Sequence, residues 1–199
     1  MQIRPLKIAD AFEITPTLIG DERGLFLEAF RADLLAEAIG HRLEIVQTNV
    51  SVSARGSVRG IHFADVPPSQ AKYITVLTGS IVDYVVDVRV GSPTFGQWDS
   101  VRLDAVDRRA VYLPEGMGHA YAALEDGTTA MYHVTAPYTP SREHGIHPLD
   151  PEVGLVLPEG MEAPLLSAKD AAAPSLAQAV ESGLLPRFDE CTSYYRSLR

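Results

Sequence analysis

Residues 43–53 of this chain, Leu-Glu-Ile-Val-Gln-Thr-Asn-Val-Ser-Val-Ser, alternate between two kinds of side chain. Successive side chains of a strand point to opposite faces, so the pattern predicts a strand with one apolar and one amide-rich face. The apolar face holds Val46, Thr48, Val50 and Val52, and the amide-rich face holds Gln47, Asn49, Ser51 and Ser53. Similar runs at 71–77, 80–89, 110–113, 119–124 and 129–136 are separated by turns rich in glycine and proline. Closely spaced strands joined by tight turns predict an antiparallel sandwich or barrel.

Helix signals are confined to the edges of this pattern. Residues 32–39 end at Gly40, and residues 174–182 begin with proline and are followed by glycine. A chain of 199 residues with 46% hydrophobic side chains can bury one sizeable core. We therefore expect a single, mainly β domain over 1–199 with short peripheral helices, its core at about 10–160 and a C-terminal helical extension at about 161–199.

Charge, cysteine content and hydropathy narrow the possible partners and the cellular location of the protein. The formal net charge of -9 argues against a nucleic-acid or anionic-membrane partner, although a few local arginines can still hold one phosphorylated metabolite. Cys191 is the only cysteine, so no intrachain disulfide can form. The N-terminal segment lacks the apolar core of a signal peptide, and no apolar run approaches the roughly 18 residues of a membrane span. We expect a cytoplasmic protein.

The segment Ser-Val-Arg-Gly-Ile-His-Phe, residues 57–63, places Arg59 and His62 three positions apart. Strict alternation would point them to opposite faces of a strand. Gly60 between them permits a bulge that would turn both to one side. The inward side chains of separate strands converge inside a barrel, so a shared site becomes possible there.

Four ionisable side chains in the strand runs are candidates for chemistry, namely His62, Lys72, His119 and Tyr132. Each also has a structural interpretation: a hydrogen-bonded histidine, a solvated edge lysine or a core tyrosine. A metal site is the competing hypothesis, because small β-barrels often bind metals through a His-x-His pair. Here Gly-Ile-His-Phe-Ala has a single histidine, and no spacing recommends His119 with Glu125 or Asp126, so we expect neither a metal nor a cofactor.

Several segments together resemble one family, the dTDP-4-dehydrorhamnose 3,5-epimerases. They are Asp21-Glu-Arg-Gly-Leu-Phe-Leu-Glu28, Gln47-Thr-Asn-Val-Ser-Val-Ser53, Val58-Arg-Gly-Ile-His-Phe63, Pro67-Pro-Ser-Gln-Ala-Lys72, Gly91-Ser-Pro-Thr-Phe-Gly-Gln-Trp98 and Tyr138-Thr-Pro. Their order and spacing agree with the family from about residue 10 to Gly183-Leu-Leu-Pro, nearly the whole chain.

The resemblance implies a metal-free, cupin-like jelly roll that is usually a homodimer with exchanged strands. The implied substrate is a dTDP-4-keto-6-deoxyhexose, inverted at carbon 3, carbon 5 or both. A base must remove the hydrogen next to the ketone while a positive group stabilises the enolate, and an acid then returns a proton to the other face.

The family's functional residues match positions of this chain. His62 matches the base, which suits imidazole because its ordinary pKa is near 6.5. Asp170 matches the carboxylate that orients this histidine, Lys72 the group facing the ketone oxygen, and Tyr132 the opposing acid. Binding positions also match. Arg23, Phe26 and Glu28 match residues that reach a nucleotide from the partner subunit, and Gln47, Asn49 and Arg59 match contacts to the diphosphate and sugar. Tyr138 matches a residue near the nucleobase, and His119 one near the sugar.

Two segments depart from the commonest family pattern. Gly118-His-Ala-Tyr121 stands where Ala-His-Gly-Phe is usual, which would reshape the sugar end of the pocket. Gly145-Ile-His-Pro-Leu-Asp-Pro151 resembles relatives that make deoxysugars for secondary metabolites. The leading hypothesis is epimerisation at carbons 3 and 5, in rhamnose or antibiotic-sugar biosynthesis. The alternatives are epimerisation at carbon 3 alone, a ketoisomerase, and a nucleotide-sugar-binding cupin without catalysis.

Overall fold

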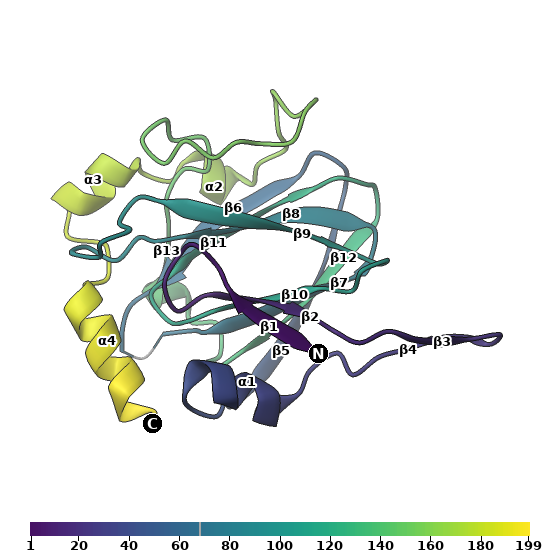
Figure 1. The fold of residues 1–199 in the computed structure, drawn as a ribbon. Coiled ribbons are helices and arrows are strands. Elements are labelled where there is room, and N and C mark those ends of the chain that lie inside the picture. The colour runs from purple at the N-terminus through teal and green to yellow at the C-terminus, as the bar shows by residue number, and fades with distance from the viewer. Residues whose placement is uncertain (68) are drawn as a thin grey trace.

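The alternating runs of the sequence form two antiparallel sheets that face each other (Figure 1), in a computed structural model that describes residues 1–67 and 69–199. The first sheet has the order β1 (Gln2–Pro5), β2 (Phe12–Thr15), β10 (Ala110–Leu113), β7 (Lys72–Thr78), β12 (Thr128–Val134) and β5 (Gln47–Ser53). The second has the order β13 (Glu143–Gly145), β6 (Val58–Ala64), β11 (Gly118–Ala123), β8 (Ser80–Val86) and β9 (Trp98–Asp104). The predicted antiparallel sandwich is thus confirmed. Pro68, in the Pro67–Lys72 segment, lies outside the described residues.

Most predicted strands lie within two or three residues of their expected bounds. The main difference is at 43–46, which precedes β5 instead of forming its first half. Leu43 is buried against the layer that contains α1 (Ala32–Ile39), so tertiary packing outweighs the alternating pattern there.

The buried apolar side chains form three clusters. One cluster lies between the two sheets and includes Ile74, Val76, Ile81, Val85, Val111 and Tyr121. A second covers the outer face of the second sheet with residues from 146–185, and a third packs α1 on the outer face of the first sheet. Because both faces of the central strands are covered, β10 and β11 are buried at every position.

Strand β5 reverses the usual arrangement of an alternating strand. Its apolar side chains point outward, with Val50 and Val52 59% and 64% exposed. Its polar side chains, from Gln47 to Ser53, face the interior. The outer face of this edge strand is an apolar surface that nothing among the described residues covers.

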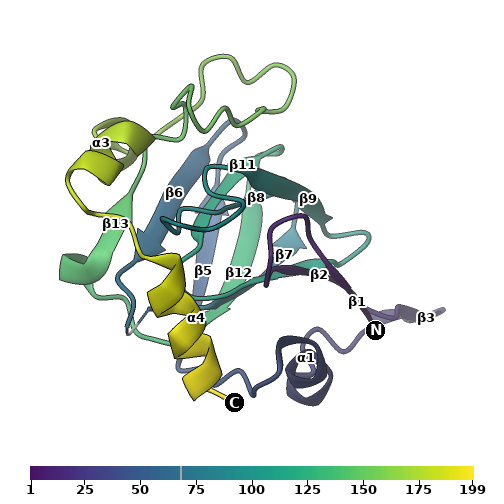
Figure 2. The same ribbon diagram turned by 60° about the vertical axis from the view of Figure 1, so that its left-hand side comes forward.

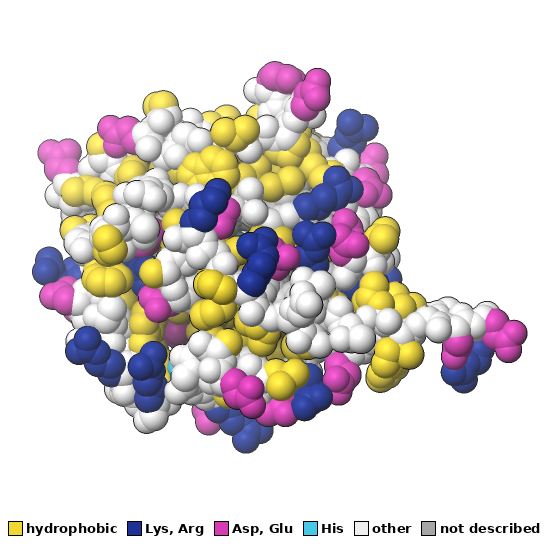
Figure 3. Space-filling model, viewed as in Figure 1, with side chains coloured by type: hydrophobic (Ala, Val, Ile, Leu, Met, Phe, Trp, Pro, Cys, Tyr) yellow, Lys and Arg dark blue, Asp and Glu magenta, His cyan; other side chains and the backbone are white. Residues whose placement is uncertain are grey.

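An arm extends from the body of the molecule (Figures 1 and 3). It consists of β3 (Ile19–Asp21) and β4 (Gly24–Phe26), which, in the described part of the chain, pair only with each other. Hydrophobic side chains gather where the arm leaves the body and charged ones at its tip, and Ile19 and Phe26 are about 60% exposed. An isolated two-stranded hairpin is marginally stable in water, so the arm gains from contact with another surface.

The helices lie at the periphery. α1 ends at Ile39, and Gly40, the helix stop predicted from the sequence, follows with a φ of 84° in the left-handed region. Beyond the sheets come η1 (Pro140–Arg142), α2 (Ala168–Ala171), α3 (Leu176–Glu181) and α4 (Phe188–Ser197). Figure 2 shows α4 running across the body toward α1. None of the described helices is long and apolar enough to span a membrane.

A buried arginine ties α4 to the sheets. Arg89 is fully buried, donates to both carboxylate oxygens of Asp87 at 2.9 Å, and lies 5.0 Å from the ring centre of Phe188. Tyr195 of the same helix donates to the Glu115 carbonyl. Removing Asp87 would leave the buried guanidinium with only the half-exposed Asp10 as an ionic partner, 3.2 Å away.

Candidate active site

A bulge in β6 brings Arg59 and His62 to the same cavity. His62 lies opposite His119 of β11 and Arg59 opposite Tyr121, so the step between them on β6 is one residue longer than on β11. A Cβ at Gly60 would lie 2.4 Å from the His119 carbonyl oxygen, and only glycine permits this approach. Both side chains line one cavity, so the predicted bulge is confirmed.

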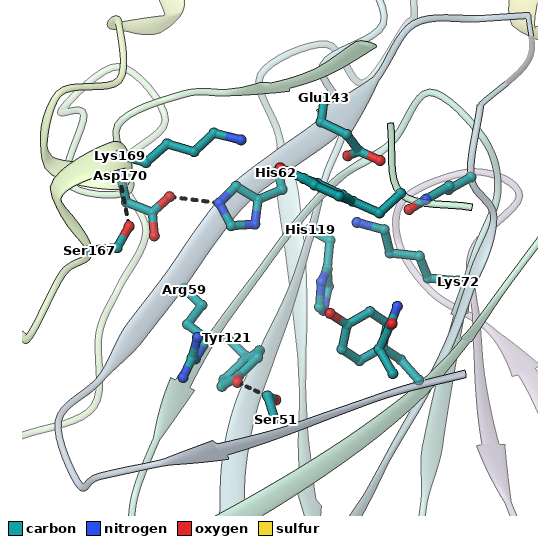
Figure 4. A pocket seen from close by; sticks show the side chains of 14 residues that line it. Ser51, Arg59, His62, Lys72, His119, Tyr121, Glu143, Ser167, Lys169 and Asp170 are labelled. Carbon is teal, nitrogen blue, oxygen red and sulfur yellow. Dashed lines mark hydrogen bonds and ion pairs between the residues drawn. The ribbon is translucent and has the colours of Figure 1, made fainter. Parts of the chain in front are cut away.

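The cavity, of about 270 Å³, opens between the two sheets (Figure 4). Its lining consists almost entirely of polar and ionisable side chains: Asn49, Ser51, Arg59, His62, Gln70, Lys72, His119, Tyr121, Tyr132, Tyr138, Glu143, Ser167, Lys169 and Asp170. All four predicted catalytic residues therefore meet here, from β6, β7, β12 and α2.

The outer imidazole–carboxylate pair is His62 with Asp170. The distance from His62 Nε2 to Asp170 Oδ1 is 2.6 Å; the histidine side chain is 34% exposed and the carboxylate 5%. Ser167 caps α2 by accepting from the Asp170 amide, which fixes the carboxylate at the start of the helix. Burial would raise the pKa of Asp170, but the hydrogen bond from His62 and its charge outweigh burial and lower it.

This pair leaves one ring nitrogen of His62 available. An ionised Asp170 only accepts, so the proton of the neutral imidazole is on Nε2 and Nδ1 carries a lone pair. No group in residues 1–67 and 69–199 bonds that Nδ1. The arrangement suits a general base whose orientation and tautomer are fixed by a carboxylate.

The inner imidazole–carboxylate pair is His119 with Asp83. Nε2 of His119 lies 2.7 Å from Asp83 Oδ2, with side-chain exposures of 9% and 0%. The other oxygen, Asp83 Oδ1, is buried and bonds no group among the described residues. A buried carboxylate favours nearby cations, and Lys72 is buried on the adjoining side of the cavity.

Lys72 lies between opposing influences on its charge. Burial lowers the pKa of its ammonium, while the charges of Glu143 and Asp83 raise it and that of Lys169 lowers it. Figure 4 shows Glu143 on the same side of the cavity as Lys72. The two carboxylates favour the protonated lysine, the form that can stabilise a developing oxyanion.

Tyr132 faces His62 across the cavity, since β12 belongs to the first sheet and β6 to the second. Burial raises the pKa of its phenol, and the charges of Tyr121 and Glu143 raise it further against the opposing effect of Arg59. The phenol therefore keeps its proton well above neutral pH. An acid and a base on opposite sides of a bound sugar is the geometry that inversion of a carbon centre needs.

The predicted binding residues divide into two groups. Asn49, Arg59, His119 and Tyr138 line the cavity, and Gln47 donates to Asn49 Oδ1 at 2.6 Å beside it. Arg23, Phe26 and Glu28 do not reach the cavity of their own chain. The first two are on the arm, where Arg23 pairs with Asp21, and Glu28 pairs with Arg31.

Six lining residues were not predicted as site residues: Ser51, Gln70, Tyr121, Glu143, Ser167 and Lys169. Two had usable signals in the sequence, because Ser51 shares the polar face of β5 with Asn49 and Lys169 adjoins Asp170. Glu143 had none, since it lies on a short strand that pairs with β6 only in the folded chain.

The sequence model of the dTDP-4-dehydrorhamnose 3,5-epimerase family matches residues 5–178. The chain belongs to this family. A dTDP-4-dehydrorhamnose 3,5-epimerase of Mycolicibacterium smegmatis is 53% identical over 199 residues, covering 100% of this chain and 98% of the relative. A dTDP-4-dehydrorhamnose 3-epimerase of Streptomyces niveus is also 53% identical, over 191 residues, covering 96% and 91%.

A solved structure confirms the fold. The rmlC epimerase of Mycobacterium tuberculosis superposes with a TM-score of 0.98 at 48% identity, and the match covers 100% of both chains. The predicted mainly β, cupin-like jelly roll is confirmed. The chain is an isomerase, an epimerase of dTDP-4-keto-6-deoxyhexoses that acts at carbons 3 and 5 or at carbon 3.

Proposed function

We propose that this epimerase inverts both carbon 3 and carbon 5 of a dTDP-4-keto-6-deoxyhexose. The observation that carries the proposal is the His62–Asp170 pair, 2.6 Å apart and in one cavity with Lys72 and Tyr132. The mycobacterial relatives named 3,5-epimerases, 53% and 48% identical over the whole chain, support the double inversion.

In the proposed mechanism, His62 Nδ1 removes the proton from the carbon next to the ketone. The electron pair moves onto the ketone oxygen, where the Lys72 ammonium stabilises the enolate. Tyr132 returns a proton from the facing sheet, so the carbon is protonated on the opposite side. Exchange with water then removes the proton from the imidazolium and returns one to the tyrosinate. The same three groups can next act at the other carbon when the sugar is turned within the cavity.

Cations at the mouth of the cavity would hold the diphosphate. Arg59 and Lys169 line it and neither pairs with a carboxylate among the described residues, in a chain whose net charge is -9. Arg59 offers a planar fork suited to phosphate oxygens and Lys169 a point charge. Asn49, with Gln47 behind it, adds neutral donors on the β5 side.

We further propose that the protein is a homodimer in which each arm completes the partner's cavity. The exposed apolar face of β5 and the isolated arm are surfaces that a second copy would cover. Arg23, Phe26 and Glu28 would then reach a nucleotide bound to the partner. Sedimentation should give twice the mass of one chain, and Val50→Lys should shift the protein toward monomer; a wild-type monomer would contradict the proposal.

Epimerisation at carbon 3 alone is the second candidate, favoured by the 53% identity to the Streptomyces niveus 3-epimerase. Incubation with dTDP-4-keto-6-deoxyglucose in heavy water, followed by mass and proton spectra, separates the two. Deuterium at carbons 3 and 5 would support the proposal, and label at carbon 3 alone would replace it with the second candidate. Absence of label would contradict both.

The cytoplasmic location expected from the sequence stays a prediction. Fractionation of the source cells with detection by antibody would test it, and recovery of the protein in the soluble cell extract is the expected result.

A further inference from the structure

Tyr121 lines the cavity and connects the two sheets beside Arg59. Its side chain comes from β11 of the second sheet and its residue is 4% exposed. Its hydroxyl lies 2.8 Å from Ser51 Oγ (Figure 4) and 3.1 Å from Ser53 Oγ, both on β5 of the first sheet. Arg59 adds a third strand, because its Nε donates to Ser53 Oγ at 3.1 Å.

The direction of these hydrogen bonds follows from counting protons. Ser53 accepts from Arg59, and its own hydroxyl proton has only Tyr121 as an acceptor among the described residues. Ser53 is buried, so a proton without an acceptor there would be costly. Ser53 therefore donates to Tyr121, and the single proton of Tyr121 is left to donate to Ser51.

Ser51 is the last residue in this series of hydrogen bonds. It accepts from Tyr121, it is half-buried, and it lines the cavity with no other bond among the described residues. Its hydroxyl proton thus points away from Tyr121 and is available to a ligand. The series of hydrogen bonds starts at the Arg59 guanidinium, and each bond polarises the next. The Ser51 hydroxyl therefore becomes a better donor to an anion.

We propose that Tyr121 is a positioning residue that holds Arg59 against β5 and turns the Ser51 hydroxyl into a donor for a diphosphate oxygen of the substrate. The inference rests on the proposed function for the identity of the ligand, a nucleoside diphosphate. Phenylalanine at this position would fill the same space, but Ser53 would lose its acceptor and Ser51 could rotate freely. The hydroxyl of Tyr121, and not its ring, is the functional element.

The test is the affinity for dTDP, measured by titration calorimetry, which needs no turnover. Tyr121→Phe should weaken dTDP binding about 5- to 10-fold, the size expected for one net hydrogen bond. Tyr84→Phe is the matched control: Tyr84 is a buried tyrosine of β8 that donates to the Val156 carbonyl and does not line the cavity. It should leave dTDP affinity unchanged.

A double-mutant cycle separates positioning from a general structural effect. If Ser51 acts through Tyr121, Tyr121→Phe combined with Ser51→Ala should bind dTDP no more weakly than the weaker single variant. Additive losses, an unchanged affinity in Tyr121→Phe, or an equal loss in Tyr84→Phe would each overturn the inference. If Tyr121→Phe fails to fold, Ser51→Ala alone tests the inference. An unchanged dTDP affinity in Ser51→Ala would overturn it.

Failure of the inference and failure of the proposed function remain distinguishable. A wild-type protein that binds dTDP but exchanges no deuterium would contradict the proposed chemistry and leave the affinity test intact. Deuterium exchange with unchanged dTDP affinity in Tyr121→Phe would contradict the inference alone. A wild-type protein that does not bind dTDP would overturn both.

Discussion

Two imidazole–carboxylate pairs of nearly equal length place a histidine on the cavity, and their surroundings differ. His62 and Asp170 meet at 2.6 Å at the mouth, and the histidine is 34% exposed. His119 and Asp83 meet at 2.7 Å on the floor, and both side chains are nearly or fully buried. His62 and His119 are direct partners across neighbouring strands, so the two pairs lie side by side.

The difference shows that hydrogen-bond geometry alone does not define a catalytic base. Asp170 comes from a helix 108 residues away in sequence and leaves a face of His62 open to the cavity. Asp83 comes from the adjoining strand and encloses His119 within the sheet. In the proposed mechanism the outer pair therefore serves proton transfer, and the inner pair holds the sugar and balances the charge of Lys72.

Substitution of the two histidines should give the largest effects and test whether their roles differ. His62→Asn is expected to lower kcat by about 10²- to 10⁴-fold, the usual contribution of a general base. His119→Asn should act mainly on KM, by about tenfold, as expected for loss of one charge-assisted hydrogen bond. Steady-state kinetics check both values, and equal losses of kcat in the two variants would contradict the division of roles.

A third histidine supplies the control for this experiment. His144 bonds Asp65 at 2.7 Å, with the same chemistry as the two pairs, but neither residue lines the cavity. His144→Asn should therefore keep kcat close to the wild-type value. A large loss there would show that His–Asp pairs matter for the fold of this sheet edge and not only in the cavity.

Lys72→Met should give the next largest effect. Methionine preserves most of the length of the side chain and removes its charge, so the enolate loses its principal stabilising group. We expect kcat to fall about 10²- to 10³-fold. Wash-in of deuterium should fall in parallel, and retention of exchange at the wild-type rate would mean that the inner pair, not Lys72, carries the enolate charge.

The two carboxylates should differ in their contribution to stability. Asp83→Asn is expected to lower the free energy of unfolding by about 1–3 kcal/mol, because His119 and the buried Lys72 lose a buried anion. Asp170→Asn should change it by less than about 1 kcal/mol, since water can reach His62. Urea unfolding at neutral pH measures both, and the reverse order would contradict the comparison.

The stability contribution of Asp170 should also depend on pH in a defined direction. Its pKa is lowered in the folded chain, so the contribution is present above the ordinary aspartate pKa of about 3.9 and is lost as the pH falls through the folded value. Asp170→Asn should remove this dependence from the acid side of the stability curve.

The smallest expected effect is a shift in the pH profile. Glu143 raises the pKa of Lys72 against the effect of burial, so Glu143→Gln should let that pKa fall further. The alkaline limb of kcat/KM should then move to lower pH, because Lys72 loses its proton sooner. Glu152→Gln, outside the cavity, is the control. A shift to higher pH would contradict the assignment of that limb to Lys72.

Much of the fold was predictable because the strand pattern is local. Alternation and turn residues predicted β5, β7, β8, β10, β11 and β12, but not β1 to β4, β9 or β13. The odd spacing around Gly60 predicted the bulge that unites Arg59 and His62. The outward direction of Val50 and Val52 was not predictable, since a pattern gives two faces without saying which is buried. The burial of Arg89 was not predictable either, because charged side chains are seldom fully buried, although its spacing of two residues from Asp87 is compatible with the ion pair.

The candidate site was predictable where the resemblance supplied it. His62, Lys72, Tyr132 and Asp170 come from four separate elements, and no spacing rule would have grouped them. Glu143 and Tyr121 show the remaining limit, because each acts through contacts with a neighbouring strand or with the opposite sheet. Such contacts are set by strand register, which the sequence specifies only weakly before the partners are known.

The arm formed by β3 and β4 has a consequence for inheritance and assay design. If each cavity is built from two chains, a His62→Asn chain and a chain with a defective arm are each inactive alone but carry complementary defects. Mixing them would create hybrid dimers in which the intact arm of the first chain meets the intact cavity of the second. Activity would return without any repaired chain, so two damaged alleles in one cell would complement each other.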